Sequence, residues 1–138
     1  MSKPEMMEIL KTYRFEAAHS LPLLPVAHKC QHVHGHSYEV VIGVKGPLDP
    51  VLMWVQDYGI ITALVEPFIK ALDHKNLNDV MGSPHTTAEG LALWLRDHLR
   101  LAAGLRWLSR IEVRETPTSN VILLLDPDYS PQTIHEIA

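Results

Sequence analysis

Apolar and polar residues alternate along two N-terminal segments, 8–19 and 34–45, and this period of two is typical of strands with one buried face. The expected buried faces consist of Tyr13, Phe15, Ala17 and His19 in the first strand and of His36, Tyr38, Val40, Ile42 and Val44 in the second. Residues 20–33, with two prolines, are expected to form a loop, and residues 46–50 a turn. Residues 108–116 and 119–126 predict two final strands joined by a turn at 117–120.

Two segments between these strands carry the spacing of a helix with one apolar stripe. The first is 57–72, in which Pro67 is expected to kink or split the helix. The second begins at a capping-box pattern, with Thr86 as N-cap and Glu89 three residues later, and runs to about Ala103, before Gly104. Residues 73–82 are expected to be a polar connection, and no structure is assigned after Asp126.

The resulting order, β-β-α-α-β-β, indicates an α+β fold: a four-stranded antiparallel sheet covered on one face by two helices. Its 138 residues predict one domain, 1–138. The two open sheet edges favour pairing with further copies of the chain.

Composition limits the possible functions without naming one. The formal net charge of -4 argues against a nucleic-acid partner. The N-terminus lacks the pattern of a secretory signal, and the longest apolar run is too short for a bilayer, so we expect no membrane association. A single cysteine cannot form an internal disulfide, which favours a reducing compartment. We therefore expect a cytoplasmic protein.

Five of the nine histidines lie between residues 19 and 36, which indicates a metal site. His34 and His36 are two residues apart on a predicted strand and point to the same side. An antiparallel hairpin would bring His19, at the end of the preceding strand, beside them. Three imidazoles leave a fourth position open, as in catalytic zinc sites. On spacing alone, His28 and His32 remain alternatives for the third ligand, and a histidine-rich loop without metal is the simpler alternative.

Candidate catalytic or binding residues lie at three further places in the sequence. Cys30 lies among the histidines, where a lowered thiol pKa would make it a nucleophile or base, although a lone cysteine is more often a small buried hydrophobe. Asp73 and His74 have the composition of a proton relay, or of an ordinary helix end. Glu115 alternates with Ile111 and Val113 and should face the core side, where it needs a partner. An ion pair with Arg110, or with Arg114 of another copy, is the structural alternative.

Together these residues resemble the 6-pyruvoyltetrahydropterin synthase family. The matching segments, in family order, are Phe15–His19, Cys30–His36, Leu72–Asn78, Thr87–Glu89 and Val113–Thr116. Three residues separate Cys30 from His34, a gap that resembles the bacterial 6-carboxytetrahydropterin synthases of the queuosine pathway. Thr86 stands where the family often has proline, and the chain after Thr116 matches nothing that we can place.

The resemblance implies a complete site on the tunnelling fold. Zn2+ would be held by His19, His34 and His36, Cys30 would accept a proton, Asp73 and His74 would relay another, and Glu115 with Thr116 would bind the pterin. The implied reaction converts 7,8-dihydroneopterin triphosphate to 6-carboxytetrahydropterin with release of acetaldehyde and triphosphate. The alternatives are the 6-pyruvoyltetrahydropterin synthase reaction and a non-catalytic zinc- or pterin-binding protein. The family also implies homotrimers or homohexamers with active sites between subunits.

Overall fold

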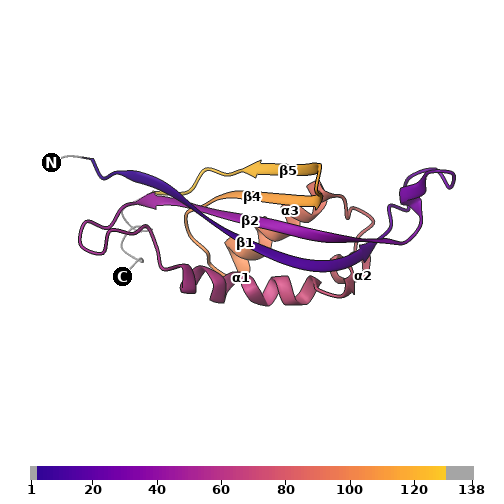
Figure 1. Ribbon diagram of the computed structural model, residues 1–138, viewed down its shortest axis with the longest axis horizontal. Coiled ribbons are helices and arrows are strands. Elements are labelled where there is room, and N and C mark those ends of the chain that lie inside the picture. Colours follow the sequence, from indigo (N-terminus) through magenta and orange to yellow (C-terminus); the bar gives the residue numbers. More distant parts are fainter. Residues whose placement is uncertain (1–2, 130–138) are drawn as a thin grey trace.

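The computed structural model describes residues 3–129, and the C-terminal segment 130–138, for which the sequence predicted nothing, lies outside the described residues. A five-stranded sheet forms one layer and the helices form a second layer on one of its faces (Figure 1). The strands are β1 (Met6–His19), β2 (His34–Pro47), β3 (Lys75–Asn76), β4 (Leu108–Thr116) and β5 (Ser119–Leu124). The helices are α1 (Tyr58–Leu72), α2 (Leu77–Met81) and α3 (Ala88–Asp97), with a 3-10 turn η1 (Lys29–Gln31) and a π-helical segment η2 (His98–Ala102).

The α+β prediction is confirmed, but the predicted number of strands was wrong. The order in the sheet is β3-β1-β2-β4-β5. The four predicted strands pair antiparallel, whereas the added two-residue strand β3 pairs parallel with Ala17 and Ala18 of β1. The segment 73–82, expected to be only a polar connection, therefore contains both β3 and the short helix α2. Two residues are too few to show a period of two, which is why the pattern missed β3.

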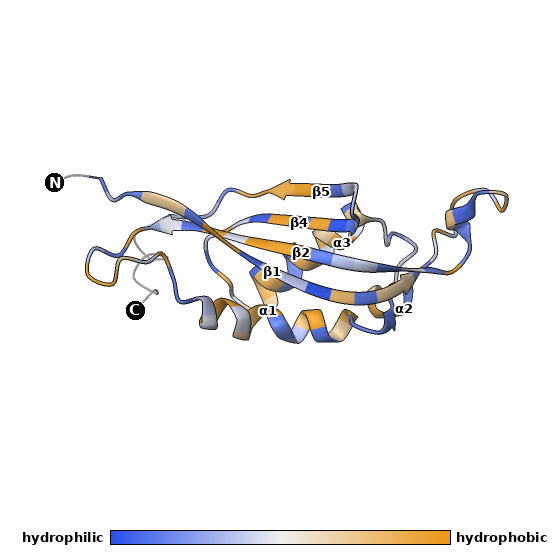
Figure 2. Cartoon of the chain, viewed as in Figure 1, coloured by the Kyte–Doolittle hydropathy of each residue, from blue (hydrophilic) through white to orange (hydrophobic). Residues whose placement is uncertain are grey.

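The core lies between the sheet and the helices. The alternating apolar positions of β2 and β4 face it, α1 contacts β1, and α3 contacts β4 and β5. Figure 2 shows the apolar middle of β2 and the mixture of apolar and polar residues along α1. Burial on this face fixes the register of β1 against β2, because a shift by one residue would turn every core side chain outward.

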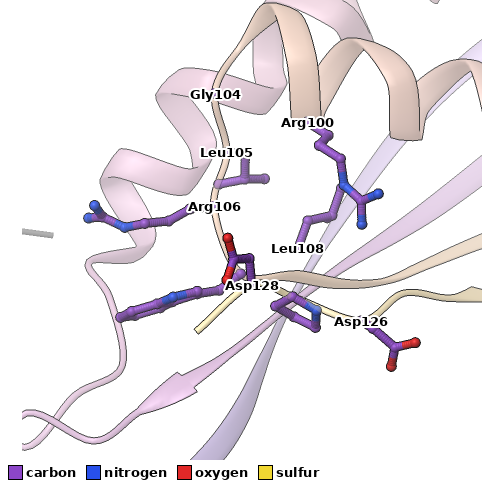
Figure 3. A pocket seen from close by; sticks show the side chains of 9 residues that line it. Arg100, Gly104, Leu105, Arg106, Leu108, Asp126 and Asp128 are labelled. Carbon is purple, nitrogen blue, oxygen red and sulfur yellow. The ribbon is translucent and has the colours of Figure 1, made fainter. Parts of the chain in front are cut away.

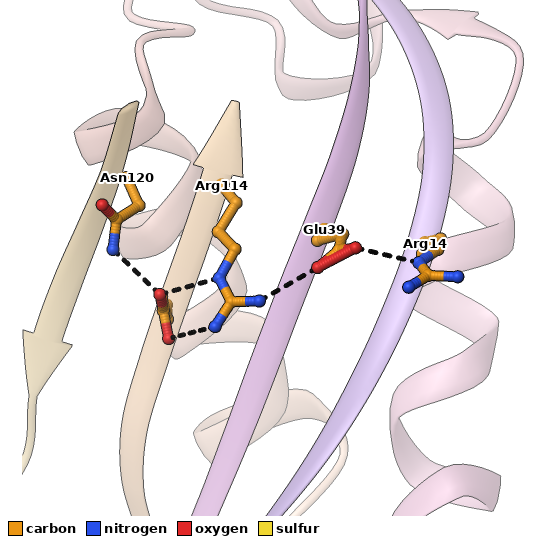
Figure 4. A network of polar contacts seen from close by, with 5 residues as sticks. Arg14, Glu39, Arg114 and Asn120 are labelled. Atoms are coloured by element: carbon orange, nitrogen blue, oxygen red, sulfur yellow. Dashed lines mark hydrogen bonds and ion pairs between the residues drawn. The ribbon is translucent and has the colours of Figure 1, made fainter. Parts of the chain in front are cut away.

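The helix-free face of the sheet carries a row of charged and polar side chains that crosses β1, β2, β4 and β5 (Figure 4). Arg14 and Arg114 both bind Glu39, each with a nitrogen–oxygen distance of 3.0 Å. Arg114 also binds Glu112, at 2.9 Å, and Asn120 donates to the same carboxylate. The two arginines lower the pKa of Glu39, and Arg114 lowers that of Glu112, so both carboxylates stay charged at neutral pH.

Helix α1 continues through Pro67 as one element, so the expected split is wrong. Proline leaves the carbonyl four residues earlier, that of Ala63, without its helical donor. Both residues are exposed, which gives the carbonyl access to water. Asp57 begins the helix by accepting a hydrogen bond from the Gly59 amide.

The N-cap of α3 is Thr87, not Thr86 as the capping-box pattern predicted. The Thr87 hydroxyl accepts from the amide of Gly90 at 3.1 Å, whereas Thr86 is buried and makes contacts elsewhere. Thr86 and Thr87 are adjacent and carry the same hydroxyl, so the pattern alone does not distinguish them. The choice places Glu89 one position too early to close the box.

Replacing Thr87 by alanine is expected to lower the free energy of unfolding by about 1 kcal/mol, the usual cost of losing an N-cap side chain. Glu89→Ala should cost less, since that carboxylate closes no capping box here. Denaturant unfolding followed by circular dichroism measures both. An equal or larger loss from Glu89→Ala would support the box that the sequence predicted.

Candidate metal centre and adjoining site

Three histidines converge where β1 ends and β2 begins. In the antiparallel pair, His19 lies directly opposite His34, as the hairpin prediction required, and His36 follows two residues later on the same side. One ring nitrogen from each of the three lies within 4.8 Å of the others. His28 and His32 are not part of this cluster. His28 instead accepts a hydrogen bond from the Cys30 amide within the loop, and the His32 carbonyl lies 2.7 Å from Nδ1 of His34.

Hydrogen bonds orient two of these rings. Nδ1 of His19 lies 2.8 Å from the Thr86 carbonyl, and Nδ1 of His34 makes the similar contact with His32. A carbonyl only accepts, so each Nδ1 carries the proton and each Nε2 presents a lone pair. Nε2 of His19 and Nε2 of His36 are buried and make no hydrogen bond, although Oε1 of Glu115 lies 3.4 Å from Nε2 of His36. Buried polar atoms normally have a partner, so these orphaned nitrogens fit a metal ion as their missing one.

Burial shapes the electrostatics of the cluster. His19 is 1% exposed, and desolvation lowers its pKa. The neutral imidazole, the form that binds a metal, is therefore favoured. The ring of Tyr38 packs beside that of His36, with 5.6 Å between the ring centres. Burial raises the pKa of the Tyr38 phenol. A donor set of three imidazole nitrogens matches the preference of zinc for histidine ligands.

Glu115 approaches the same cluster from β4. Its Oε1 lies 3.4 Å from Nε2 of His36, so the carboxylate reaches the metal-binding end of the sheet. The alternative partners are otherwise engaged within this chain: Arg110 binds Glu8, and Arg114 binds Glu39 and Glu112. The prediction that Glu115 points to the same side as the core residues of β4 agrees with this contact.

Asp73 and His74 lie at the edge of the sheet, after α1. Nδ1 of His74 is 2.9 Å from Oδ1 of Asp73. The Glu16 amide donates to the same oxygen of Asp73, and the His74 amide donates to the Glu16 carbonyl. The hydrogen bond from the Glu16 amide makes the larger contribution to lowering the pKa of Asp73, and the bond with the His74 side chain makes the next. His74 is held at a φ of 58°, and its side chain is largely exposed.

Two neighbouring cavities connect these groups. One, of about 540 Å³, is lined by His36 and His74 among others. The second, of about 690 Å³, is lined by His36, Glu115 and Thr116. Both include Glu16, Gly35 and Ser37, so His36 lines both the cavity that contains His74 and the cavity that contains Glu115.

Cys30 is not among the three clustered donors, and it lines neither of these two cavities. It lies in η1, within the loop between β1 and β2 that extends beyond the end of the sheet (Figure 1). Its backbone is tied to that loop, since its carbonyl accepts from Leu21 and its amide donates to His28. The thiol is partly exposed.

A further cavity, of about 360 Å³, lies at the start of β4, the opposite end of that strand from Glu115 (Figure 3). Its lining combines Arg100 and Arg106 with Asp126 and Asp128. These charges of both signs give no preference for an anionic ligand, and the lining shares no residue with the histidine site.

Sequence reasoning missed two residues that support the cluster. Thr86 was assigned to a helix cap, yet its carbonyl orients His19. Asn78 was noticed only as part of a family segment, yet its side chain joins three segments around His19. The sequence signal for Thr86 was the pair of adjacent threonines, of which only one could cap α3.

Comparisons with known proteins agree with this geometry. The sequence model of the family described as 6-pyruvoyl tetrahydropterin synthase matches residues 8–124. A 6-carboxy-5,6,7,8-tetrahydropterin synthase from Synechocystis sp. is 36% identical over 119 residues, covering 83% of this chain and 90% of that protein. A 6-pyruvoyl tetrahydrobiopterin synthase from Drosophila melanogaster is 32% identical, covering 92% of this chain and 84% of that protein.

A dihydroneopterin monophosphate aldolase from Pyrococcus furiosus is 31% identical over 86 residues, covering 62% of this chain and 68% of that protein. The structure of Caenorhabditis elegans 6-pyruvoyl tetrahydropterin synthase superposes with a TM-score of 0.79 at 22% identity, covering 91% of this chain and all of that one, which supports the fold. None of the described helices is both long and apolar enough to cross a membrane. By its sequence match and its fold, the chain belongs to the 6-pyruvoyl tetrahydropterin synthase family.

Proposed function

We propose that this protein is a zinc-dependent lyase that converts 7,8-dihydroneopterin triphosphate and water to 6-carboxytetrahydropterin, acetaldehyde and triphosphate. The observation that carries the proposal is the cluster of His19, His34 and His36, two of whose Nε2 atoms are buried and without a hydrogen-bond partner. The 36% identity to the Synechocystis enzyme and the three-residue gap between Cys30 and His34 favour the carboxy-forming reaction.

The three histidines would hold Zn2+, which would supply Lewis acidity toward the hydroxyl groups of the substrate side chain. Glu115 would bind the pterin, because a carboxylate only accepts hydrogen bonds and the pterin ring offers neighbouring N–H donors. Thr116, in the wall of the same cavity, would contact the ring beside it. The pterin would then place its side chain toward His36.

Cys30 and His74 would move protons. Asp73 holds His74 by its Nδ1, which leaves Nε2 of His74 as the atom that gives or takes a proton. The thiolate of Cys30 would remove a proton from the substrate side chain. Proton removal prepares the loss of triphosphate, and the carbon–carbon cleavage that releases acetaldehyde follows.

A homo-oligomer would complete this site. Cys30 lies outside the cluster. Large apolar side chains are exposed in two loops at opposite ends of the molecule (Figure 1): Leu23, Val26 and Val33 in the β1–β2 loop, and Val51, Leu52, Met53 and Trp54 after β2. Among the described strands, β5 has a free edge as well. Trimers or hexamers joined through these surfaces would bring Cys30 of one copy to His74 of another.

The test is to incubate the zinc-loaded protein with 7,8-dihydroneopterin triphosphate and to identify the pterin product by mass spectrometry. The expected product is 6-carboxytetrahydropterin, with equimolar acetaldehyde. A 6-pyruvoyl product would assign the chain to the alternative elimination reaction of the Drosophila relative. A hydroxymethyl pterin would indicate aldolase chemistry. Bound but unchanged substrate would leave only a binding role.

A further inference from the structure

The side chain of Asn78, in the first turn of α2, joins three separate segments beside the histidine cluster. Its Oδ1 accepts from the Ser20 amide at 2.9 Å. Its Nδ2 lies 3.0 Å from the Ser20 carbonyl, 3.2 Å from the Ser83 carbonyl and 3.4 Å from Oγ1 of Thr86. One amide therefore ties the end of β1, helix α2 and the loop before α3 to one another.

Two of these segments carry the hydrogen bond that orients His19. Ser20 follows His19 directly, and the Thr86 carbonyl is the acceptor for its Nδ1. Thr86 itself is 1% exposed, and its hydroxyl also lies 3.3 Å from the Ser20 carbonyl. Asn78 thus holds both the strand that supplies the imidazole and the loop that supplies its acceptor.

His34 and His19 differ in how far along the chain their carbonyl acceptors lie. His34 contacts the carbonyl of His32, which is only two residues away and is placed by the same loop. His19 contacts the Thr86 carbonyl, which is 67 residues away in the sequence. Chain connectivity alone does not hold β1 and the loop before α3 together. A shift of that loop would free the ring to rotate and to change tautomer, and its Nε2 would no longer point into the cluster.

We propose that Asn78 is a positioning residue for the metal centre, acting through Ser20 and Thr86 on the orientation of His19. The inference rests on the metal site of the proposed function. Partners that orient a metal-binding histidine commonly govern affinity by 10- to 100-fold, although they never touch the ion. Asparagine suits the position because it offers an acceptor and two donors on one rigid amide. Aspartate would keep the acceptor for Ser20 but turn an anionic oxygen toward two carbonyl groups.

The experiment measures zinc affinity of the metal-free protein by competition with a chromophoric chelator. Asn78→Ala and Asn78→Asp are each expected to weaken zinc binding by about 10- to 100-fold. Thr86→Val removes the contacts of that hydroxyl with Asn78, with the Ser20 carbonyl and with Nδ1 of His19. It keeps the backbone carbonyl that accepts from His19, and it is expected to weaken zinc binding less. The matched control is Asn76→Ala, which removes the cap bond to the backbone amide of Asn78 but none of the bonds that the Asn78 side chain makes to Ser20, Ser83 and Thr86.

Unfolding of all metal-free variants by denaturant separates stability from affinity. Asn76→Ala should lose stability but bind zinc as the wild type does. In the cobalt-substituted protein, Asn78→Asp should change the visible ligand-field spectrum, which loss of stability alone would not alter. If the wild type binds zinc and the folded Asn78 and Thr86 variants bind it equally tightly, the inference is overturned. If the wild type binds none, the proposed metal site fails first and the inference with it.

Discussion

Alanine in place of His36 is expected to weaken zinc binding by more than about 100-fold, beyond what the loss of a supporting partner usually costs, and to abolish turnover. The reason is the geometry of the cluster: the three ring nitrogens lie within 4.8 Å of one another. Removing one leaves two protein ligands, fewer than the three that zinc enzymes ordinarily use. His19→Ala and His34→Ala should behave in the same way.

Matched controls come from the same histidine-rich stretch. His28 and His32 lie within six residues of His34 but outside the cluster, so His28→Ala and His32→Ala should retain zinc. Zinc content by elemental analysis and affinity by chelator competition give direct readouts. Thermal unfolding gives a third, because an ion that binds only the folded state stabilises it by about 2.7 kcal/mol at a hundred times its Kd. If His36→Ala still binds zinc tightly, the proposed metal centre is wrong.

The histidine cluster could be predicted because it depends on local rules. Side chains two residues apart on a strand share a side, which paired His34 with His36. A hairpin between consecutive strands then placed His19 opposite His34, and the register of β1 with β2 confirms it. The position of Glu115 followed from the same alternation along β4. The family resemblance added roles to these residues, but their juxtaposition follows from the period of the strands.

Other features depend on contacts that no local pattern contains. Strand β3 exists only because the segment after α1 meets the free edge of β1 at Ala17 and Ala18. The choice of Thr87 over Thr86 as the cap depends on Thr86 being buried near His19, which is 67 residues away. Asn78 acts through three segments that are brought together only by the complete fold. The proposed meeting of Cys30 with His74 would depend on a second copy of the chain, which no pattern within one chain can describe.

Cys30→Ala is expected to leave zinc binding and stability close to those of the wild type and to reduce turnover by about 10²- to 10⁴-fold, the usual contribution of a general acid or base. Cys30 is not among the clustered ligands, so the metal site does not need it. Cys30→Ser should also be nearly inactive, since a serine hydroxyl is far less acidic than a thiol. Loss of zinc from Cys30→Ala would instead make this residue a ligand.

The same variant tests whether the site lies between subunits. The structure holds Cys30 in the β1–β2 loop and His74 at the edge of β1, bound to Asp73. If each active site takes its cysteine and its histidine from different copies, mixing inactive Cys30→Ala and His74→Ala chains should restore activity. With random assembly at equal amounts, about a quarter of the sites receive both intact residues, so recovery should approach about a quarter of wild-type turnover. Denaturing the two variants together and refolding them ensures that copies exchange, and each variant refolded alone is the control. If the mixture remains as inactive as its components while wild-type protein refolds with full activity, both residues must come from one chain, and the loop carrying Cys30 would have to fold back over its own histidine cluster.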